Sequence, residues 1–113
     1  MAISMKDSSS GDMTILEVFG HLDGSGAPEL EKRCLPLYDR KGAKLLLDFS
    51  SLEYISSAGL RELLVLAKKA RAAEGALVIC SLSPMVREVM EMSGFDKLLR
   101  LADSREVAAQ AMA

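Results

Sequence analysis

Two adjacent serines, Ser56 and Ser57, are the residues whose type and position could most directly carry chemistry, because they stand just before a long stretch with helical periodicity. The start of a helix has backbone N–H groups without partners and a partial positive charge. A phosphate group is favoured there, so a serine hydroxyl at this place could accept a phosphoryl group. Serine is also a preferred N-cap residue, worth ~1 kcal/mol, and capping without any further role stays open.

Gly59 lies in the first turn of the same expected helix. A glycine in a helix interior costs up to ~1 kcal/mol relative to alanine. Its missing side chain should therefore serve another purpose, and close approach of a second backbone or of a partner protein would be such a purpose.

The remaining candidates for chemistry are weaker. His21 is the only histidine, and no motif supplies the nucleophile and carboxylate of a triad. Cys34 and Cys80 have no metal-binding spacing and are expected to be small buried apolar side chains in a reducing compartment. Asp48 ends a strand and could bind Mg²⁺ together with other carboxylates, but a supporting role in a turn or cap is the expected one. We predict no catalytic residue, no metal site and no cofactor.

Length and composition narrow the class of protein. With 113 residues the chain predicts one domain, residues 1–113. Half of the residues are apolar, 27% are charged, and a net charge of -2 provides no electrostatic reason to bind nucleic acid or an anionic membrane. No apolar run approaches the ~20 residues of a membrane span, and residues 1–10 lack the apolar core of a signal peptide. We expect a cytoplasmic protein that is a monomer or a weak dimer.

The elements that must position these residues follow from hydrophobic periodicity. Strands are expected at 2–6, 13–19, 45–49 and 76–80, with a short one possible at 98–101. A first helix is expected from Pro28, kinked or ended early by Pro36, and a second at 58–74, ended by Gly75. A third should run from Ser83–Pro84 to Gly94, and a fourth at 105–112, capped by Asp103 or Ser104. The turn 7–12 and the loops 20–26 and 50–57 connect them. This order predicts an α/β fold with a mixed sheet of four to five strands, a leading hairpin and about four helices.

Two sets of apolar side chains have two possible roles each. Because residues 63–66 are apolar on all sides of the helix, either Val65 or Leu66 should point away from the sheet, towards a neighbouring helix or a partner protein. Met85, Met90 and Met92 are expected to fill the core, although an adaptable binding surface is the alternative.

The stretch from Leu45 to Leu64, with its buried strand, acidic strand end and Ile-Ser-Ser-Ala-Gly-Leu sequence before a helix, resembles the STAS domain. More closely, it is similar to the small bacterial anti-sigma factor antagonists, also called anti-anti-sigma factors. Gly20-His21-Leu22-Asp23 is similar to the Gly-x-Leu-Asp turn of that family, and the helix with Gly-Phe in 82–95 fits it too. The resemblance covers nearly the whole chain.

This resemblance implies a phosphorylation site. The common core of the family reads Asp-Ser-Ser-Gly-Leu, and its first serine accepts the phosphoryl group. Aligning the Gly-Leu with Gly59 and Leu60 puts the acceptor at Ser57. Ser56 then stands where many members have Asp, and it is the second candidate; Ala58 replaces the second serine.

The resemblance also implies partners rather than catalysis. The unmodified protein would bind an anti-sigma factor that is a serine kinase with the histidine-kinase-like ATPase fold, phosphorylation would release it, and a PP2C-type phosphatase would reset the switch. The expected docking residues lie at two strand ends: Asp23, Gly24, Ser25, Ser56, Ser57, Ala58, Gly59, Arg61 and Val65. Two alternatives stay open. One is a STAS adaptor subunit of a transporter or signalling complex that is never phosphorylated. The other is a small flavodoxin-like nucleotide-binding enzyme that uses Asp48 and Asp23.

Overall fold

The chain begins with an antiparallel hairpin. The computed structural model describes residues 3–112, and in it the whole of β1 (Ile3–Ser10) pairs with the first eight residues of β2 (Met13–Leu22). The turn is shorter than the expected 7–12, because Gly11 with φ +62° reverses the chain directly after Ser10. The polar serines of β1 join the ladder because strand pairing needs only backbone groups. The expected strand at 2–6 is thus extended by the turn geometry; residue 2 lies outside the described residues.

The rest of the sheet is parallel. β3 (Lys44–Asp48), β5 (Ala76–Cys80) and the short β6 (Leu101–Ala102) follow β2 in the order β1-β2-β3-β5-β6. The sixth strand, β4 (Leu52–Ile55), pairs with the last residues of β2. The mixed sheet with a leading hairpin is confirmed. The prediction of a loop throughout 50–57 is wrong, because β2 continues past the end of β3 and leaves an edge on which β4 pairs.

Within residues 3–112, four α-helices complete the fold: α1 (Ala27–Cys34), α2 (Ser57–Ala72), α3 (Pro84–Ser93) and α4 (Arg105–Met112). The early end of the first helix is confirmed, since the chain tightens into the 3-10 helix η1 (Leu35–Asp39) at Pro36. A second 3-10 turn, η2 (Phe95–Lys97), follows α3. Ser83 and Ser104 cap α3 and α4 through their hydroxyls.

The end of α2 differs in one detail from the expectation. The left-handed residue is Glu74, with φ +55°, rather than Gly75. Gly75 is needed for another reason, because a Cβ there would lie 2.2 Å from the Ala43 carbonyl oxygen. Glycine at this position allows the chain that leaves α2 to pass against the start of β3.

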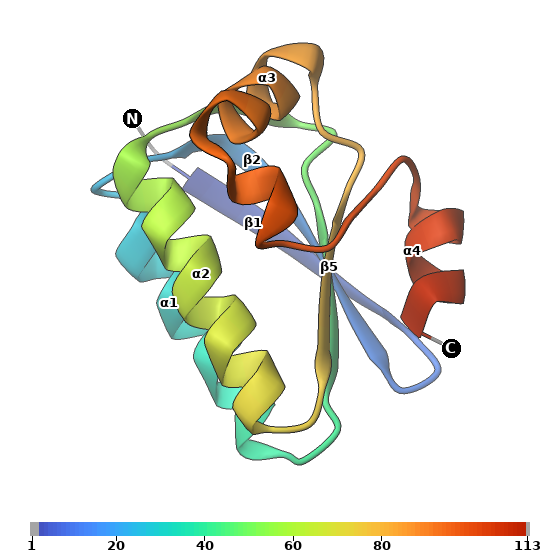
Figure 1. The fold of residues 1–113 in the computed structure, drawn as a ribbon. Coiled ribbons are helices and arrows are strands. Elements are labelled where there is room, and N and C mark those ends of the chain that lie inside the picture. The colour runs from blue at the N-terminus through green and yellow to red at the C-terminus, as the bar shows by residue number, and fades with distance from the viewer. Residues whose placement is uncertain (1–2, 113) are drawn as a thin grey trace.

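The helices cover the two faces of the sheet unequally (Figure 1). α1 and α2 lie side by side on one face over the larger core, which contains Cys34, whereas α4 alone packs on the other face, over Cys80. Both cysteines are buried and free, as expected. Of the three α3 methionines only Met90 fills the core; Met85 and Met92 are 57% and 80% exposed, so core filling was the wrong expectation for those two.

Candidate functional site

The site is assembled by the pairing of β2 with β4. Leu22 lies opposite Ile55 in parallel register, so both strands end at the same edge of the sheet. The loop that begins at Asp23 and the start of α2 at Ser56 therefore leave the sheet next to each other. A hydrogen bond joins them directly, because the Ser56 N–H donates to the Leu22 carbonyl oxygen at 3.0 Å. The two predicted halves of the docking surface are adjacent.

Ser56 is the N-cap of α2. Its backbone is extended, with φ −106° and ψ 177°, and its Oγ accepts a hydrogen bond from the Gly59 N–H at 3.4 Å. Half-buried, it uses its hydroxyl to satisfy one of the free donors of the helix start. The capping role is thus filled by Ser56.

Ser57 is the first residue of α2, and its side chain is exposed. Within residues 3–112, its hydroxyl has no hydrogen-bond partner. Arg61 and Val65 follow at intervals of four residues and therefore extend the same outward line of the helix. Val65 is 42% exposed, whereas Leu66 is fully buried, so Val65 is the residue that points away from the sheet.

The missing side chain of Gly59 allows close packing within the fold. It is buried, and a Cβ on it would lie 2.3 Å from the Leu22 carbonyl oxygen and 2.9 Å from Cγ1 of Ile55. The approach of a second backbone, one of the two purposes considered for this glycine, is therefore present within the fold. Ala58 beside it is half-buried.

The Asp23 loop is held by its own carboxylate. Asp23 Oδ1 accepts hydrogen bonds from the Ser25 N–H at 3.0 Å, the Ser25 hydroxyl at 2.9 Å and the Gly26 N–H at 3.0 Å. The Gly26 N–H, followed by the Ser25 hydroxyl, lowers the pKa of Asp23 below its ordinary value. The loop thus presents a fixed negative charge at the sheet edge from which α2 begins, with Gly24 and Ser25 exposed.

Three further side chains flank the site, and the predicted docking residues did not include them. His21 Nε2 lies 3.5 Å from Oε1 of Glu53, and its ring lies 5.6 Å from that of Tyr54, which is 45% exposed. They come together because His21 pairs with Tyr54 across β2 and β4. Assigning a strand to residues 52–55 would have found them.

Asp48 supports the fold at a different strand end. It is 4% exposed, accepts from the Ser50 N–H at 2.9 Å and pairs with Nε of Arg105 at 2.6 Å. Burial alone would raise its pKa, but the hydrogen bonds from Ser50 and Arg105 outweigh burial, and the pKa is lowered. The expected role in a turn is confirmed, and the ion pair also tethers α4.

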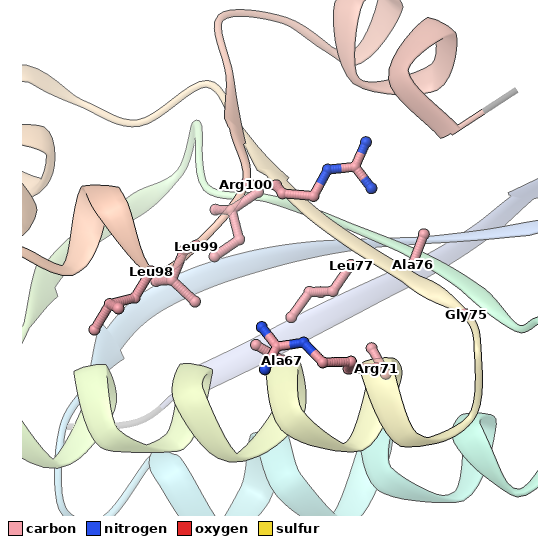
Figure 2. Close-up of a pocket in the computed structure, with 10 residues that line it drawn as sticks. Ala67, Arg71, Gly75, Ala76, Leu77, Leu98, Leu99 and Arg100 are labelled. Carbon is pink, nitrogen blue, oxygen red and sulfur yellow. The ribbon is translucent and has the colours of Figure 1, made fainter.

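A small hollow lies beside the C-terminal half of α2, away from Ser57 (Figure 2). Its volume is about 180 Å³, and most of the residues that line it are apolar. The Arg71 side chain extends into it from α2, whereas Arg100 points away and donates to the Ala111 carbonyl oxygen at 2.9 Å. Ligand pockets usually combine a larger volume with several converging polar groups, so this hollow does not rival the start of α2.

The described residues show neither a metal-binding cluster nor a membrane-spanning helix. No group of three or more His, Cys, Asp or Glu side chains within residues 3–112 could hold a metal ion. No helix among these described residues is long and apolar enough to cross a membrane.

Fold and site together define a class: a small α/β protein with a mixed sheet that presents a serine at the start of a helix beside an acidic loop. The STAS domain family model matches residues 5–108. The chain therefore belongs to the STAS domain family.

Individual relatives narrow the comparison. The chain is 43% identical over 99 residues to a protein of Bordetella bronchiseptica named putative anti-sigma factor antagonist BtrV, covering 88% of this chain and 85% of that protein. A putative anti-sigma factor antagonist from Thermotoga maritima has the same fold, with a TM-score of 0.88 at 19% identity over 96% of this chain and 93% of that one. Phosphorylated SpoIIAA from Bacillus matches with a TM-score of 0.69 at 20% identity, over 97% and 99%. By sequence, the chain is thus similar over most of its length to a protein named as a putative anti-sigma factor antagonist.

Proposed function

We propose that this chain is an anti-sigma factor antagonist that acts as a partner switch, with Ser57 as the phosphorylated residue. The observation that supports this assignment best is the exposed Ser57 hydroxyl at the first position of α2. The neighbouring Ser56 uses its hydroxyl to cap the helix, so it is the less suitable acceptor. The cytoplasm is the compartment in which such a switch would act.

The unmodified chain would bind an anti-sigma factor that is a serine kinase with the histidine-kinase-like ATPase fold. The docking surface comprises the Asp23–Ser25 loop and the outward line of α2 that includes Ser57, Arg61 and Val65. Tyr54 and His21 border it. A PP2C-type phosphatase would remove the phosphate. A phosphorylation cycle is supported by one structural relative, SpoIIAA, whose structure has been solved in a phosphorylated form.

Phosphorylation should change binding far more than folding. A phosphoserine carries a charge of ~-1.5 to -2 at pH 7, and the start of α2 partly compensates this charge. In a docked interface the same dianion would be desolvated and would lie close to the fixed charge of Asp23. A loss of ~3 kcal/mol there corresponds to more than a hundredfold in affinity.

The first experiment is mass spectrometry of the chain isolated from its host, with and without the gene of its anti-sigma kinase. Phosphate on Ser57 that requires the kinase is the expected result. Phosphate on Ser56, or none in either strain, would refute the assignment.

Binding of the purified kinase to variants is the second experiment. Ser57→Asp should bind more than a hundredfold more weakly than the parent while melting within a few degrees of it. Ser56→Ala is the matched control, because it should lose a cap worth ~1 kcal/mol and still accept phosphate on Ser57. If Ser57→Asp unfolds or binds like the parent, the switch is wrong, and a Ser57→Ala variant with undisturbed signalling would favour a scaffolding adaptor.

A further inference from the structure

Arg61 is the cation nearest in sequence to Ser57 on α2. Between residues 57 and 64 of this helix it is the only Lys, Arg or His. Its side chain is exposed, and among residues 3–112 its guanidinium group takes part in no ion pair or hydrogen bond. An arginine without a described partner thus stands one helical turn after the proposed phosphorylation site.

The geometry of the helix directs this arginine back towards Ser57. Residues four apart on an α-helix are neighbours on its surface, with about 5–6 Å between their Cβ atoms. A long helical side chain also points towards the N-terminus, so it covers the turn before its own Cα. α2 runs without a break from Ser57 to Ala72, and the side chains of Ser57 and Arg61 are both exposed. The guanidinium group can therefore reach a group attached to the Ser57 hydroxyl while the helix stays as it is.

The charged groups on the neighbouring elements leave a phosphate on Ser57 without another close cation. Asp23 carries a fixed negative charge at the sheet edge from which α2 begins, and it would repel such a phosphate. His21 of β2 lies 3.5 Å from the Glu53 carboxylate of β4. The arginines of α1 and α3 are already in ion pairs, Arg33 with Asp7 and Arg87 with Asp103. Arg61 is thus the cation best placed to compensate the phosphate.

We propose that the Arg61 guanidinium binds the phosphate once Ser57 is phosphorylated. A guanidinium group offers several N–H donors in a planar fork and can bind two phosphate oxygens at once. In the unmodified chain the same group is free at the proposed docking surface. Phosphorylation then changes this surface twice, because it adds a dianion and also engages the cation next to it. This inference rests on the proposed function, and it names the residue of this chain that holds the phosphate.

The test uses the full chain with phosphoserine incorporated at position 57 during translation, so it does not depend on the kinase. Phosphorus-31 NMR at a series of pH values follows the second ionisation of the phosphate, which has a pKa of ~6 in phosphoserine. A cation that binds the dianion lowers this pKa, by ~0.5 for an exposed ion pair. Arg61→Gln should therefore raise the phosphate pKa by ~0.5 relative to the phosphorylated parent, and Arg61→Lys should restore part of the difference.

Lys68→Gln is the matched control, because it removes the same charge from the same helix. Lys68 is exposed and continues the outward line of α2, but it lies roughly 16 Å further along the helix axis than Ser57. Charges this far apart are largely screened at physiological ionic strength, where the Debye length is ~8 Å. The control should leave the phosphate pKa within ~0.1 of the parent, and melting curves verify that all variants fold.

Equal phosphate pKa values in the Arg61→Gln and Lys68→Gln variants would overturn the inference, while the proposed function would stand. A Ser57 that the host kinase leaves without phosphate would refute the proposed function and this inference with it. The NMR comparison distinguishes the two failures, because the phosphate is present in it whether or not the kinase acts on Ser57.

Discussion

Substituting Gly59 by alanine tests whether the start of α2 is packed against β2 as closely as described. The new Cβ would lie 2.3 Å from the Leu22 carbonyl oxygen, whereas such contacts are essentially never under 3.0 Å, so α2 would have to retreat by at least 0.7 Å (3.0 minus 2.3). The carbonyl cannot simply turn aside, because it accepts the hydrogen bond from the Ser56 N–H. Ile55 offers no free space either, since its Cγ1 would lie 2.9 Å away.

The size of the effect follows from two opposing contributions. Overpacking of this kind costs up to ~3 kcal/mol, and the better helix propensity of alanine returns up to ~1 kcal/mol. The net loss of about 2 kcal/mol should lower the melting temperature by roughly 10 °C in a domain of this size. Differential scanning calorimetry or thermal circular dichroism measures the change.

A matched control uses Gly24, in the loop beside the same helix. A Cβ on Gly24 would meet nothing within 4 Å, and its φ is not positive. Gly24→Ala should therefore melt within about 2 °C of the parent, as expected for surface changes within ~0.5 kcal/mol. If Gly59→Ala and Gly24→Ala melt alike, the close contact with Leu22 is refuted, and with it the reason for a glycine in the first turn.

Two further predictions concern stability and pH. Arg105→Gln leaves the buried carboxylate of Asp48 without its cation and should cost about 1–2 kcal/mol at pH 7, less than for a fully buried pair, because the Arg105 side chain is 39% exposed. Since the pKa of Asp48 is lowered in the folded state, this stabilisation is present above the ordinary value of 3.8 and is lost on further acidification, so urea melts of parent and variant should converge at low pH. For Glu62 the pH dependence of stability runs in the opposite direction. Folding raises the pKa of Glu62 from 4.5 to about 7, so the parent loses stability as the pH rises through this range. Glu62→Gln should therefore be more stable than the parent by roughly 2 kcal/mol at pH 8. Denaturant melts that show the same difference at pH 4 and pH 8 would contradict the burial of an ionisable Glu62.

The central strands and the longest helix could be predicted because their patterns have few alternatives. Residues 45–49 and 76–80 are apolar on both faces, which is typical of parallel strands covered by helices on each side. The early end of α1 followed from Pro36, whose ring cannot be accommodated within a regular helix. The prediction failed for Met85 and Met92, because a methionine on a helix with an apolar face has the same pattern whether it faces the core or solvent.

The sequence predicted that the site lies at two strand ends, but it did not predict that these ends lie side by side. The rule that parallel strands carry functional loops at their carboxyl ends placed the Asp23 loop and Ser57 at the same side of the sheet. That the two strand ends lie side by side depends on β4. Its four residues are too few to show a periodicity of two, and its partner is the part of β2 that continues past a bulge at Gly20. Pairing across a sheet is a long-range property that local patterns do not encode.

The same limit explains why the burial of Glu62 against Glu31 was not predicted. Each glutamate alone has the pattern of a solvated helix position, since charged side chains usually lie at the surface. Only the packing of α1 on α2 buries Glu62 and brings it against Glu31, and no ion pair to a cation is formed by either residue within residues 3–112. The same packing of α1 on α2 also helps to hold the helix that begins with Ser57 in place.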